Sequence, residues 1–453
     1  MGNKVTNKIL WMFAIGQLGW SMLAGIVTNW FVYFYAPDMN NIDPTHIIFI
    51  PVGAVCLGLT IIGLISAVGR IFDAITDPWI ASKSDAFSHK LGRRIPFMRF
   101  AAIPFGIVTI LLFSPPIQET STTNAIYVGV FYILFYLLFT VYCTPYNALI
   151  PILGKSQENR TKISTYISLT FIVGTTISFA LPNIASIFGD LGYTVSFRIA
   201  VTILSIISII CMLVPAVCIN ERDFDNSEPV KTKVFESLGK TFKNKQFRIF
   251  VASDVLYFIA ITMFNTGMPF YVTSLLELDE SMTFIVIAIM TVCSLVFYPI
   301  VGKLLKKFGK KRMVVFAFVF FSLTFIFTAL AGRVGLSPLF HGILIAVLAS
   351  LPMAILGIIP SAMIADIAES DAKETKENRE GMFYAARTFA FKFGQSFAMV
   401  LFTSVMLIGS ESGLGLRLTA IIACVFSLLG AIVLVRYNEK DIYKIIGVKR
   451  DEN

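Results

Sequence analysis

The sequence predicts an all-α membrane protein with twelve transmembrane helices, arranged as two pseudo-symmetric six-helix bundles. Composition is the first reason: 56% of the 453 residues are hydrophobic and only 14% are charged, which leaves too little polar surface for a soluble chain of this length. The apolar residues also gather into runs of about 20 residues, the length that a helix needs to cross a bilayer. Finally, one long charged interruption separates six of these runs from the other six.

The apolar runs are expected to be helices, because a helix satisfies its own backbone hydrogen bonds inside lipid and the sequence lacks the short alternating strands of a barrel. The first run follows Lys4 and Lys8 and is too long for a signal-peptide core, so it is predicted to be a span. The predicted spans are residues 9–35, 49–82, 95–113, 125–150, 163–187, 195–217, 249–275, 282–301, 313–331, 339–365, 382–407 and 416–435.

Positive charge predicts the orientation of the spans. Nearly all of the 37 Lys and Arg residues fall on one side of the membrane when both termini share that side, and the opposite loops keep only Arg198, Arg333 and Arg417. Because cytoplasmic loops are enriched in Lys and Arg, we predict a multi-pass protein of the cell inner (cytoplasmic) membrane with both termini in the cytoplasm. The net charge of +9 is then a topology signal, and no nucleic-acid partner is predicted.

The charged interruption and a repeated turn predict the domain organisation. After the second span of each half, a glycine is followed by paired basic residues, GRR at 92–94 and GKK at 309–311. Duplicated halves that enclose a site near the bilayer midplane are usual in secondary transporters. The predicted parts are an N-terminal six-helix bundle (1–217), a cytoplasmic linker (218–248), a C-terminal six-helix bundle (249–436) and a cytoplasmic tail (437–453).

Two carboxylates inside the second span are the strongest functional signal. Asp73 and Asp77 are four residues apart, so both lie on one helix face. Charge at membrane depth costs roughly 2.5–3.5 kcal/mol per residue, and two like charges repel, so either one acid is protonated or a cation lies between them. The structural alternative is an ion pair with Arg70 that holds helices together. Pro78 favours a site, because it bends the helix and frees a backbone carbonyl.

Positive charges also fall inside the span predicted at 382–407. Lys392 lies near its middle and needs an anionic partner, for which Asp73 or Asp77 is the obvious choice; a pair that breaks on loading would be a conformational latch. Arg387 lies nearer the cytoplasm, where it either snorkels to the interface or meets a substrate. Charged residues at the cytoplasmic helix ends are predicted to act in gating, namely Asp85, Arg93, Arg94, Asp366 and Glu369. For Asp366 and Glu369, simple solvation is equally open.

Several motifs resemble one known family. They are GIVTNWFVYFY (25–35), RIFDAITDP (70–78), TPYNALIP (144–151) and MFYAARTFAFKFG (382–394). With these motifs the chain resembles the glycoside–pentoside–hexuronide:cation symporter family of the major facilitator superfamily, whose best-known members are the melibiose/cation symporters. The resemblance implies the major facilitator fold, alternating access and sodium- or proton-coupled symport of a small polar solute, with a sugar, a glycoside or a uronide as substrate. It implies no cofactor other than the transported Na⁺ or H⁺, and a monomer in the lipid bilayer.

The resemblance also implies roles for individual residues. Asp73, Asp77 and Thr140 match cation-binding positions, and Thr76 stands where the melibiose symporters have an asparagine ligand. Lys392 matches a lysine that interacts with those aspartates, and Arg70 matches an arginine on the same helix. The sugar site departs from the family, so a galactoside held by carboxylates and stacked on tryptophan is not expected. The predicted substrate-binding residues are Ser21, Asn29, Trp30, Cys143, Asn147, Arg387, Thr388 and Gln395.

Other functions remain to be compared with sugar symport. Distant relatives in this family move lysolipids, and loss of the polar sugar residues makes a lysolipid or amphiphile transporter an alternative. An intramembrane enzyme is not expected, because the sequence has no HExxH motif and no Ser/His arrangement, and no metal other than a sodium ion is predicted. A transporter-derived sensor would need an output domain, for which the loops and tail are short. Hydrolysis-driven transport is not expected, since no GxxxxGK[ST] loop occurs.

Overall fold

The protein folds into two compact helical units. The structure is a computed structural model that describes residues 5–40, 42–56, 58–154, 156–224, 234–376 and 380–447. Unit 1 comprises residues 1–232 together with 279–284, and unit 2 comprises residues 233–278 and 285–453. The boundary between residues 232 and 233 falls inside the segment predicted as a linker.

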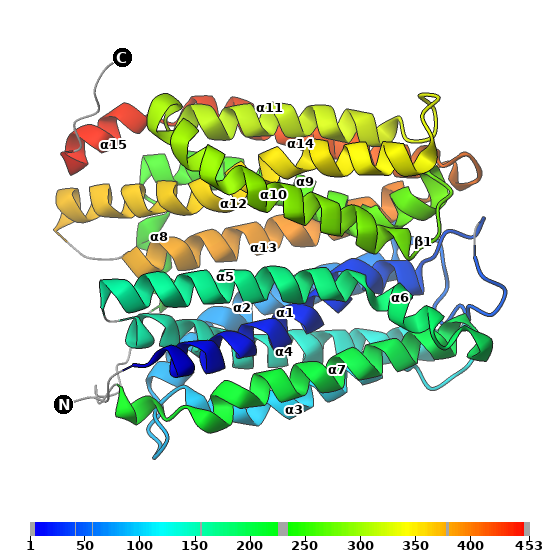
Figure 1. Ribbon diagram of the computed structural model, residues 1–453, viewed down its shortest axis with the longest axis horizontal. Coiled ribbons are helices and arrows are strands. Elements are labelled where there is room, and N and C mark those ends of the chain that lie inside the picture. The colour runs from blue at the N-terminus through cyan, green and yellow to red at the C-terminus, as the bar shows by residue number, and fades with distance from the viewer. Residues whose placement is uncertain are drawn as a thin grey trace. The chain divides into compact units, whose positions relative to one another are not determined.

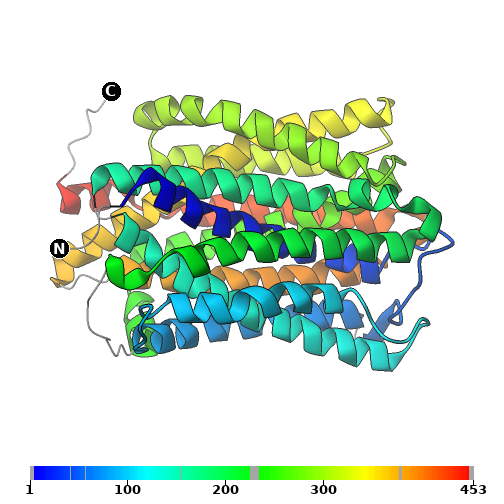
Figure 2. The same cartoon turned by 60° about the horizontal axis from the view of Figure 1, so that its bottom comes forward.

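Unit 1 is built around its first helix. The helix α1 packs against α5 and α7, while α3 lies against α4 and α7, and α2 packs on α4 (Figures 1 and 2). A short antiparallel hairpin of β1 (Ala54–Cys56) and β2 (Leu59–Thr60) precedes α2. The helices are α1 (Asn7–Tyr35), α2 (Ile61–Asp85), α3 (Ile95–Leu112), α4 (Thr122–Leu153), α5 (Gln157–Phe179), α6 (Leu181–Ser186) and α7 (Tyr193–Cys218), with 3₁₀ turns at Gly189–Leu191 and Glu221–Asp223.

Unit 2 repeats this pattern of helix packing. The helix α9 packs against α13 and α14, and α11 lies against α12 and α14. The segments predicted as linker and tail contribute α8 and α15 to this unit. The elements are α8 (Val234–Thr241), α9 (Lys245–Phe270), a π-helix (Tyr271–Leu275), α10 (Met282–Phe308), α11 (Lys310–Ala329), α12 (Pro338–Thr375), α13 (Glu380–Val405), a 3₁₀ turn (Ser410–Ser412), α14 (Leu414–Val435) and α15 (Glu439–Ile446). The first residues of α10 fall in the part assigned to unit 1.

The helix lengths agree with the prediction of twelve spans. The described residues contain twelve helices of 18 residues or more, and nine of these are also apolar enough to cross a membrane. The other three are α2, α5 and α13. Two of them, α2 and α13, carry the charged residues that the sequence marks as functional candidates, so their lower hydropathy comes from the predicted site itself.

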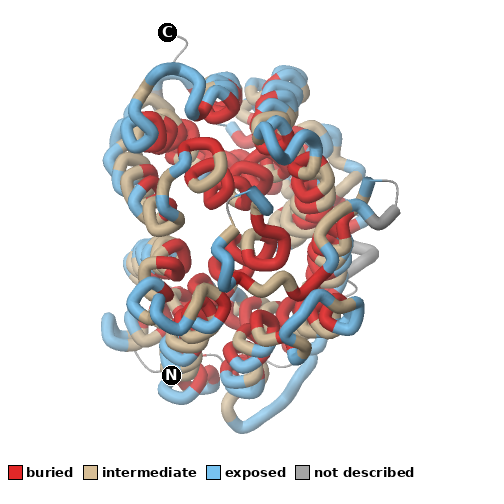
Figure 3. The backbone as a smooth tube through the Cα atoms, turned by 90° about the vertical axis from the view of Figure 1, so that its right-hand side faces the viewer, coloured by how far each residue is buried: buried red, intermediate tan, exposed pale blue. Residues whose placement is uncertain are grey.

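Apolar side chains cover the outside of the helices as well as the core. On α10, Val292, Val296 and Ile300 recur every four residues and are 60%, 64% and 44% exposed. Most helices have one buried and one exposed face (Figure 3). An exposed face of large aliphatic residues is stable in contact with lipid, because lipid tails replace the water that would otherwise hydrate it.

Two predicted span boundaries are wrong, and backbone chemistry explains both. The predicted span 49–82 begins only at Ile61, because Gly53 and Gly58 adopt positive φ angles of 131° and 79° and turn the chain into the hairpin. The predicted span 163–187 is divided into α5 and α6. Pro182 lies in the first turn of α6, where a residue without an N–H is tolerated, so the second helix begins there.

Candidate cation site and its partners

The two carboxylates of α2 meet at one hydroxyl group of α4. The Oγ1 of Thr140 lies 2.9 Å from Oδ1 of Asp73 and 3.1 Å from Oδ1 of Asp77. Asp73 and Thr140 are fully buried. One hydroxyl proton can be donated to only one carboxylate at a time, so oxygens of both acids converge on a single hydroxyl group.

Further oxygen atoms surround this pair. Thr144, one turn beyond Thr140, donates to Oδ1 of Asp77 at 3.3 Å. The Oγ1 of Thr76 lies 3.4 Å from Oγ1 of Thr140 and donates to the backbone of Phe72 at 3.0 Å, which leaves its lone pairs available. Carboxylate and hydroxyl oxygens are the ligands that hard cations prefer. The residues present therefore fit a sodium ion, and the acids alone fit a proton.

Sequence reasoning missed Thr144, although a signal was present. Thr140 and Thr144 are four residues apart on α4, as Asp73 and Asp77 are on α2, so both pairs project from one helix face. Each second member is followed by a buried proline inside its helix, Pro78 or Pro145. A proline has no N–H, so the carbonyl four residues earlier loses its helical partner and becomes a further oxygen acceptor on that turn.

Thr140 is expected to set cation affinity. Replacing it as Thr140→Val keeps the size of the side chain but removes the hydroxyl between the two acids, so the cation concentration for half-maximal uptake should rise about tenfold or more. Thr140→Ser keeps the hydroxyl and should stay within about threefold of the parent protein. Uptake measured against sodium concentration and against pH checks both variants. Equal affinity in the valine and serine variants would exclude Thr140 from the cation site.

Arg70 has partners beyond the aspartate considered in the sequence. It is 8% exposed, donates from its Nη2 to Oγ1 of Thr28 at 3.2 Å, and lies 5.0 Å from the ring centre of Tyr136. Its guanidinium is therefore held between α1 and α4 by a hydroxyl and an aromatic face. Its role in coupling, which the family resemblance implies, remains a prediction.

Unit 2 places the two positively charged residues of α13 in different surroundings. Lys392 is buried, at 6% exposed. Arg387 forms a bidentate ion pair with Asp254 of α9, with N–O distances of 2.7 Å and 3.0 Å, and the rings of Phe250 and Phe258 lie 5.8 Å from its guanidinium. The guanidinium of Arg387 is thus paired with a carboxylate of its own unit, and its contact with an anionic substrate stays a prediction.

Three predicted substrate residues of α1 pack against α5. Asn29 donates to Oγ of Ser178 at 3.1 Å, and the indole N–H of Trp30 donates to the backbone oxygen of the same residue at 2.8 Å. Ser21 is fully buried and donates to the carbonyl of Leu18. In this structure these side chains join two helices of unit 1 or bond within α1, and their contact with a substrate stays a prediction.

The remaining predicted substrate residues have varied exposure. Cys143 is buried, Asn147 is exposed on α4, and Thr388 and Gln395 are half-buried on α13. Their contact with a substrate stays a prediction.

The basic turn of unit 1 is held by an acid that the sequence did not mark. Glu221 accepts hydrogen bonds from the backbone N–H of Arg94 at 2.6 Å and from its guanidinium at 3.2 Å. Arg94 also pairs with Asp85 at 2.8 Å. Gly92 has a φ of 105°, and a Cβ there would lie 2.4 Å from the side chain of Glu221, so only glycine fits. Arg93, the other predicted gating residue of this turn, is half-buried.

The basic turn of unit 2 is stabilised in the same way, by a glutamate that accepts a backbone hydrogen bond. Glu439 accepts from the backbone N–H of Lys310 at 2.9 Å, and the ammonium of Lys310 pairs with Asp366. Glu221 and Glu439 each lie just after the sixth long helix of their unit and cap the start of the third. The predicted gating residue Glu369 instead forms an exposed pair with Lys373 one turn away, which contributes little stability.

Removing one of these caps is expected to destabilise unit 1. Glu221→Gln loses the charge in two hydrogen bonds to Arg94, which should cost about 1–3 kcal/mol and lower the thermal midpoint of the purified protein by several degrees. The matched control is Glu158→Gln, because Glu158 is 75% exposed in its pair with Lys162. A melting curve followed by tryptophan fluorescence measures both. An unchanged midpoint for Glu221→Gln would contradict this role.

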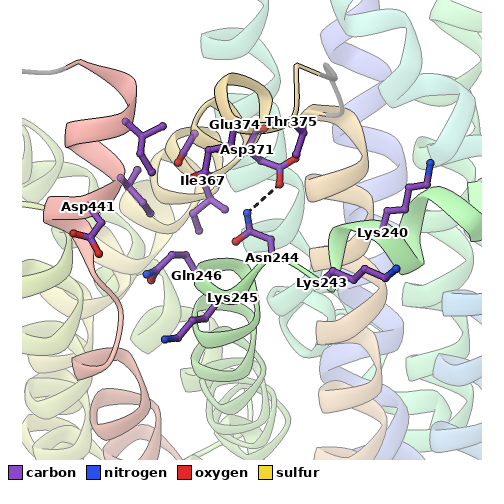
Figure 4. Close-up of a pocket in the computed structure, with 13 residues that line it drawn as sticks. Lys240, Lys243, Asn244, Lys245, Gln246, Ile367, Asp371, Glu374, Thr375 and Asp441 are labelled. Atoms are coloured by element: carbon purple, nitrogen blue, oxygen red, sulfur yellow. Dashed lines mark hydrogen bonds between the residues drawn. The ribbon is translucent and has the colours of Figure 1, made fainter.

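Unit 2 also contains a cavity of about 700 Å³ between α8, α9, α12 and α15 (Figure 4). Asn244 at its floor donates to Asp371 at 3.1 Å. The side chains of Lys240, Lys243 and Lys245 point in different directions, and acidic residues lie opposite them (Figure 4). This cavity therefore has no converging set of charges for one ion, and it belongs to a different unit from the carboxylates of α2.

Comparison with known proteins identifies the family. The family described as "MFS/sugar transport protein" matches residues 12–440 of the chain. The chain belongs to this family. It is thus a multi-pass membrane transporter of the major facilitator type, and the resemblance to the glycoside/cation symporters is confirmed.

Several similar proteins are named as symporters. The chain is 28% identical to the inner membrane symporter YicJ of Escherichia coli over 52% of this chain, a region that spans only 49% of that relative. It is 23% identical to the symporter YnaJ of Bacillus subtilis over 86% of this chain and 80% of the relative. It is also 23% identical to the sodium-dependent lysophosphatidylcholine symporter 1 of Gallus gallus, over 82% of this chain and 72% of the relative.

Solved structures with the same fold include two transporters. A point mutant of the nucleoside transporter NupG matches with a TM-score of 0.69 at 13% identity over 96% of this chain and all of that one. The D-xylose-proton symporter matches with a TM-score of 0.68 at 14% identity over 95% of this chain and 97% of that one. At this identity the likeness concerns the fold alone, and it confirms the predicted fold class.

Proposed function

We propose that this protein is a secondary active transporter that couples the movement of Na⁺ or H⁺ to the symport of a small polar solute, a sugar or glycoside. The observation that carries the proposal is the meeting of Asp73 and Asp77 at the hydroxyl of Thr140 inside a membrane helix. Intramembrane carboxylates are costly, so they are kept where they bind a transported cation. Relatives named as glycoside/cation and inner membrane symporters support the same function.

In the proposed cycle, the cation binds between the two carboxylates and offsets their repulsion. Lys392 of unit 2 supplies the positive charge that balances these acids when no cation is bound, so loading with a cation frees it. The substrate then binds, and the two six-helix units rock about the midplane. The proposal includes a monomer in the inner membrane with both termini in the cytoplasm, and no enzymatic activity.

Transport in proteoliposomes tests the function. The protein is reconstituted and supplied with a panel of nitrophenyl glycosides, including a glucoside, a galactoside, a xyloside and a glucuronide, under an imposed sodium gradient or an imposed proton gradient. Uphill accumulation of at least one glycoside under one gradient is expected. Absence of uptake across the whole panel would overturn the sugar part of the proposal.

A lysolipid is the second candidate substrate. The relatives named lysophosphatidylcholine symporters align over most of this chain, 82% in one case and 88% in another, which favours testing them in parallel. The same proteoliposomes are therefore supplied with lysophosphatidylcholine. Gradient-dependent movement of this lipid, with no glycoside uptake, would replace the sugar assignment while leaving the cation coupling in place.

A further inference from the structure

Trp20 of α1 differs from its neighbours on the same helix. Asn29 and Trp30 are buried against α5, whereas Trp20 is half-buried. Its ring lies edge-on to Phe139 of α4, with centres 5.7 Å apart at 76°, and is tilted against Phe171 of α5 at 5.9 Å. The three rings form an aromatic cluster within unit 1.

Two N–H groups near this cluster have no acceptor. Within the part of the chain that the structure describes, Nε1 of Trp20 and Nε of Arg70 are buried and make no hydrogen bond. A buried donor without a partner costs about 1–3 kcal/mol, and native proteins contain few of them. Trp30, a fully buried tryptophan of the same helix, does have an acceptor: its indole N–H donates to the carbonyl of Ser178 at 2.8 Å.

The aromatic cluster is continuous with the cation site. Phe139 directly precedes Thr140, the residue between the two carboxylates. One turn earlier, Tyr136 lies 6.2 Å from the ring of Phe139 and 5.0 Å from the guanidinium of Arg70. Along α4, Phe139 of the aromatic cluster therefore lies next to Thr140 of the candidate cation site in the chain.

A pyranoside matches the aromatic cluster and its indole N–H chemically. One face of its ring carries C–H groups that pack on an aromatic surface, and its hydroxyl and ether oxygens accept hydrogen bonds from N–H donors. An alkyl chain would cover the aromatic faces but would leave the indole N–H of Trp20 unpaired. In a packed core a nearby carbonyl can accept from an indole N–H, as one does for Trp30, and Trp20 lacks such an acceptor among the described residues.

We propose that Trp20 is the specificity-determining residue of the substrate site, stacking on the apolar face of a pyranoside while its indole N–H donates to an oxygen of the same sugar. The proposal rests on the function proposed above. It adds a residue that neither the family resemblance nor the comparison with relatives identifies.

The test uses variants that separate the ring from its N–H. Trp20→Phe keeps an aromatic face but removes the donor, so the KM of the best-transported nitrophenyl glycoside should rise roughly 3- to 10-fold with little change in Vmax. Trp20→Ala removes both and should raise KM further. The matched control is Trp11→Phe, because Trp11 lies on the same helix, is 40% exposed and should leave KM unchanged.

The KM values of deoxygenated substrates distinguish the loss of one specific hydrogen bond from a general effect of misfolding. In the parent protein, removing the hydroxyl that meets the indole N–H should raise KM by a similar factor, and in Trp20→Phe the same removal should have almost no further effect. Substrate-induced change of tryptophan fluorescence should persist in the Phe variants of Trp11 and Trp79 but disappear in Trp20→Phe.

The outcomes separate the two proposals. If the parent protein accumulates a glycoside but Trp20→Phe keeps the parent KM, deoxy-sugar profile and fluorescence change, the role of Trp20 is overturned and the function stands. If the parent protein accumulates no glycoside, the sugar function fails and this inference fails with it. A uniform loss of uptake for all substrates with an unchanged deoxy-sugar profile would also overturn the stacking role.

Discussion

Asp73→Asn and Asp77→Asn are each expected to abolish uphill accumulation of substrate. Asparagine keeps the shape of the side chain and an oxygen that can accept from Thr140, so the local packing of α2 on α4 should survive. The substitution removes one of the two charges that attract the cation. Because the asparagine is neutral, it does not repel the remaining carboxylate, and no cation is needed to offset a repulsion. The gradient then has no means of driving the solute.

The measurement compares two modes of transport in the same proteoliposomes. Uphill uptake under a sodium or proton gradient should fall to the level of empty liposomes, whereas exchange of labelled for unlabelled substrate at equal concentrations should persist in part. Asp190→Asn is the control, because Asp190 is exposed in a 3₁₀ turn of the same unit and should leave both modes unchanged. Full accumulation in either α2 variant would remove the carboxylate pair from the coupling mechanism.

The sequence was informative wherever charge lies inside an apolar run. A carboxylate in a membrane helix is costly enough to stand out without any structure, and four-residue spacing alone places Asp73 and Asp77 on one face. Thr140 came from family resemblance, and its position between the acids agrees with that expectation. The repeated basic turns were also visible, since glycine and paired basic residues follow the second span in each half.

Uncharged polar residues could not be assigned in the same way. Asn29 and Trp30 look like substrate ligands in a one-dimensional sequence, but the partner that satisfies them, Ser178, is about 150 residues away on α5. Trp20 carries no sequence signal that distinguishes it from Trp30, because the difference lies in whether a neighbouring helix offers an acceptor. Glu221 was missed for a related reason: it lies outside the spans, and its role appears only once α7 returns to the start of α3.

Glu280 is expected to make the docking of one connecting segment depend on pH. It lies between the π-helix and α10, in the part of that connection that belongs to unit 1. Its two carboxyl oxygens accept from the hydroxyl of Tyr193 at 3.3 Å and 3.1 Å, and Tyr33 adds a further hydrogen bond. Burial is the main cause that raises the pKa of Glu280 from 4.5 to about 7, and the nearby carboxylates of Asp279 and Asp43 raise it further.

A further titratable group in this contact is His46, whose ring stacks on that of Tyr193 with centres 4.4 Å apart. Burial lowers the pKa of His46 below 6.5, so it is largely neutral at pH 7. The charge change of the docked segment near neutral pH therefore comes mainly from Glu280. The residues on either side of the segment, 278 and 285, belong to unit 2.

The direction in which docking changes with pH follows from the raised pKa of Glu280 in the docked state. Below pH 4.5 the carboxyl is protonated whether the segment is docked or free, and docking has its full strength. Between pH 4.5 and about 7 the free segment loses a proton that the docked one keeps, so docking weakens as pH rises, by about 3 kcal/mol in total. Above about pH 7 the carboxyl is ionised in both the docked and the free segment, so the free energy of docking no longer changes with pH.

Hydrogen exchange of the backbone amides in residues 279–284, corrected for intrinsic rates, measures this docking. Protection should fall between pH 5.5 and pH 8 in the parent protein. Glu280→Gln is neutral at every pH and should keep its protection across the range, since the amide can still accept from Tyr193. Glu277→Gln, an exposed residue of the same connection, should behave as the parent does. If the parent and Glu280→Gln lose protection in parallel, another group controls the segment.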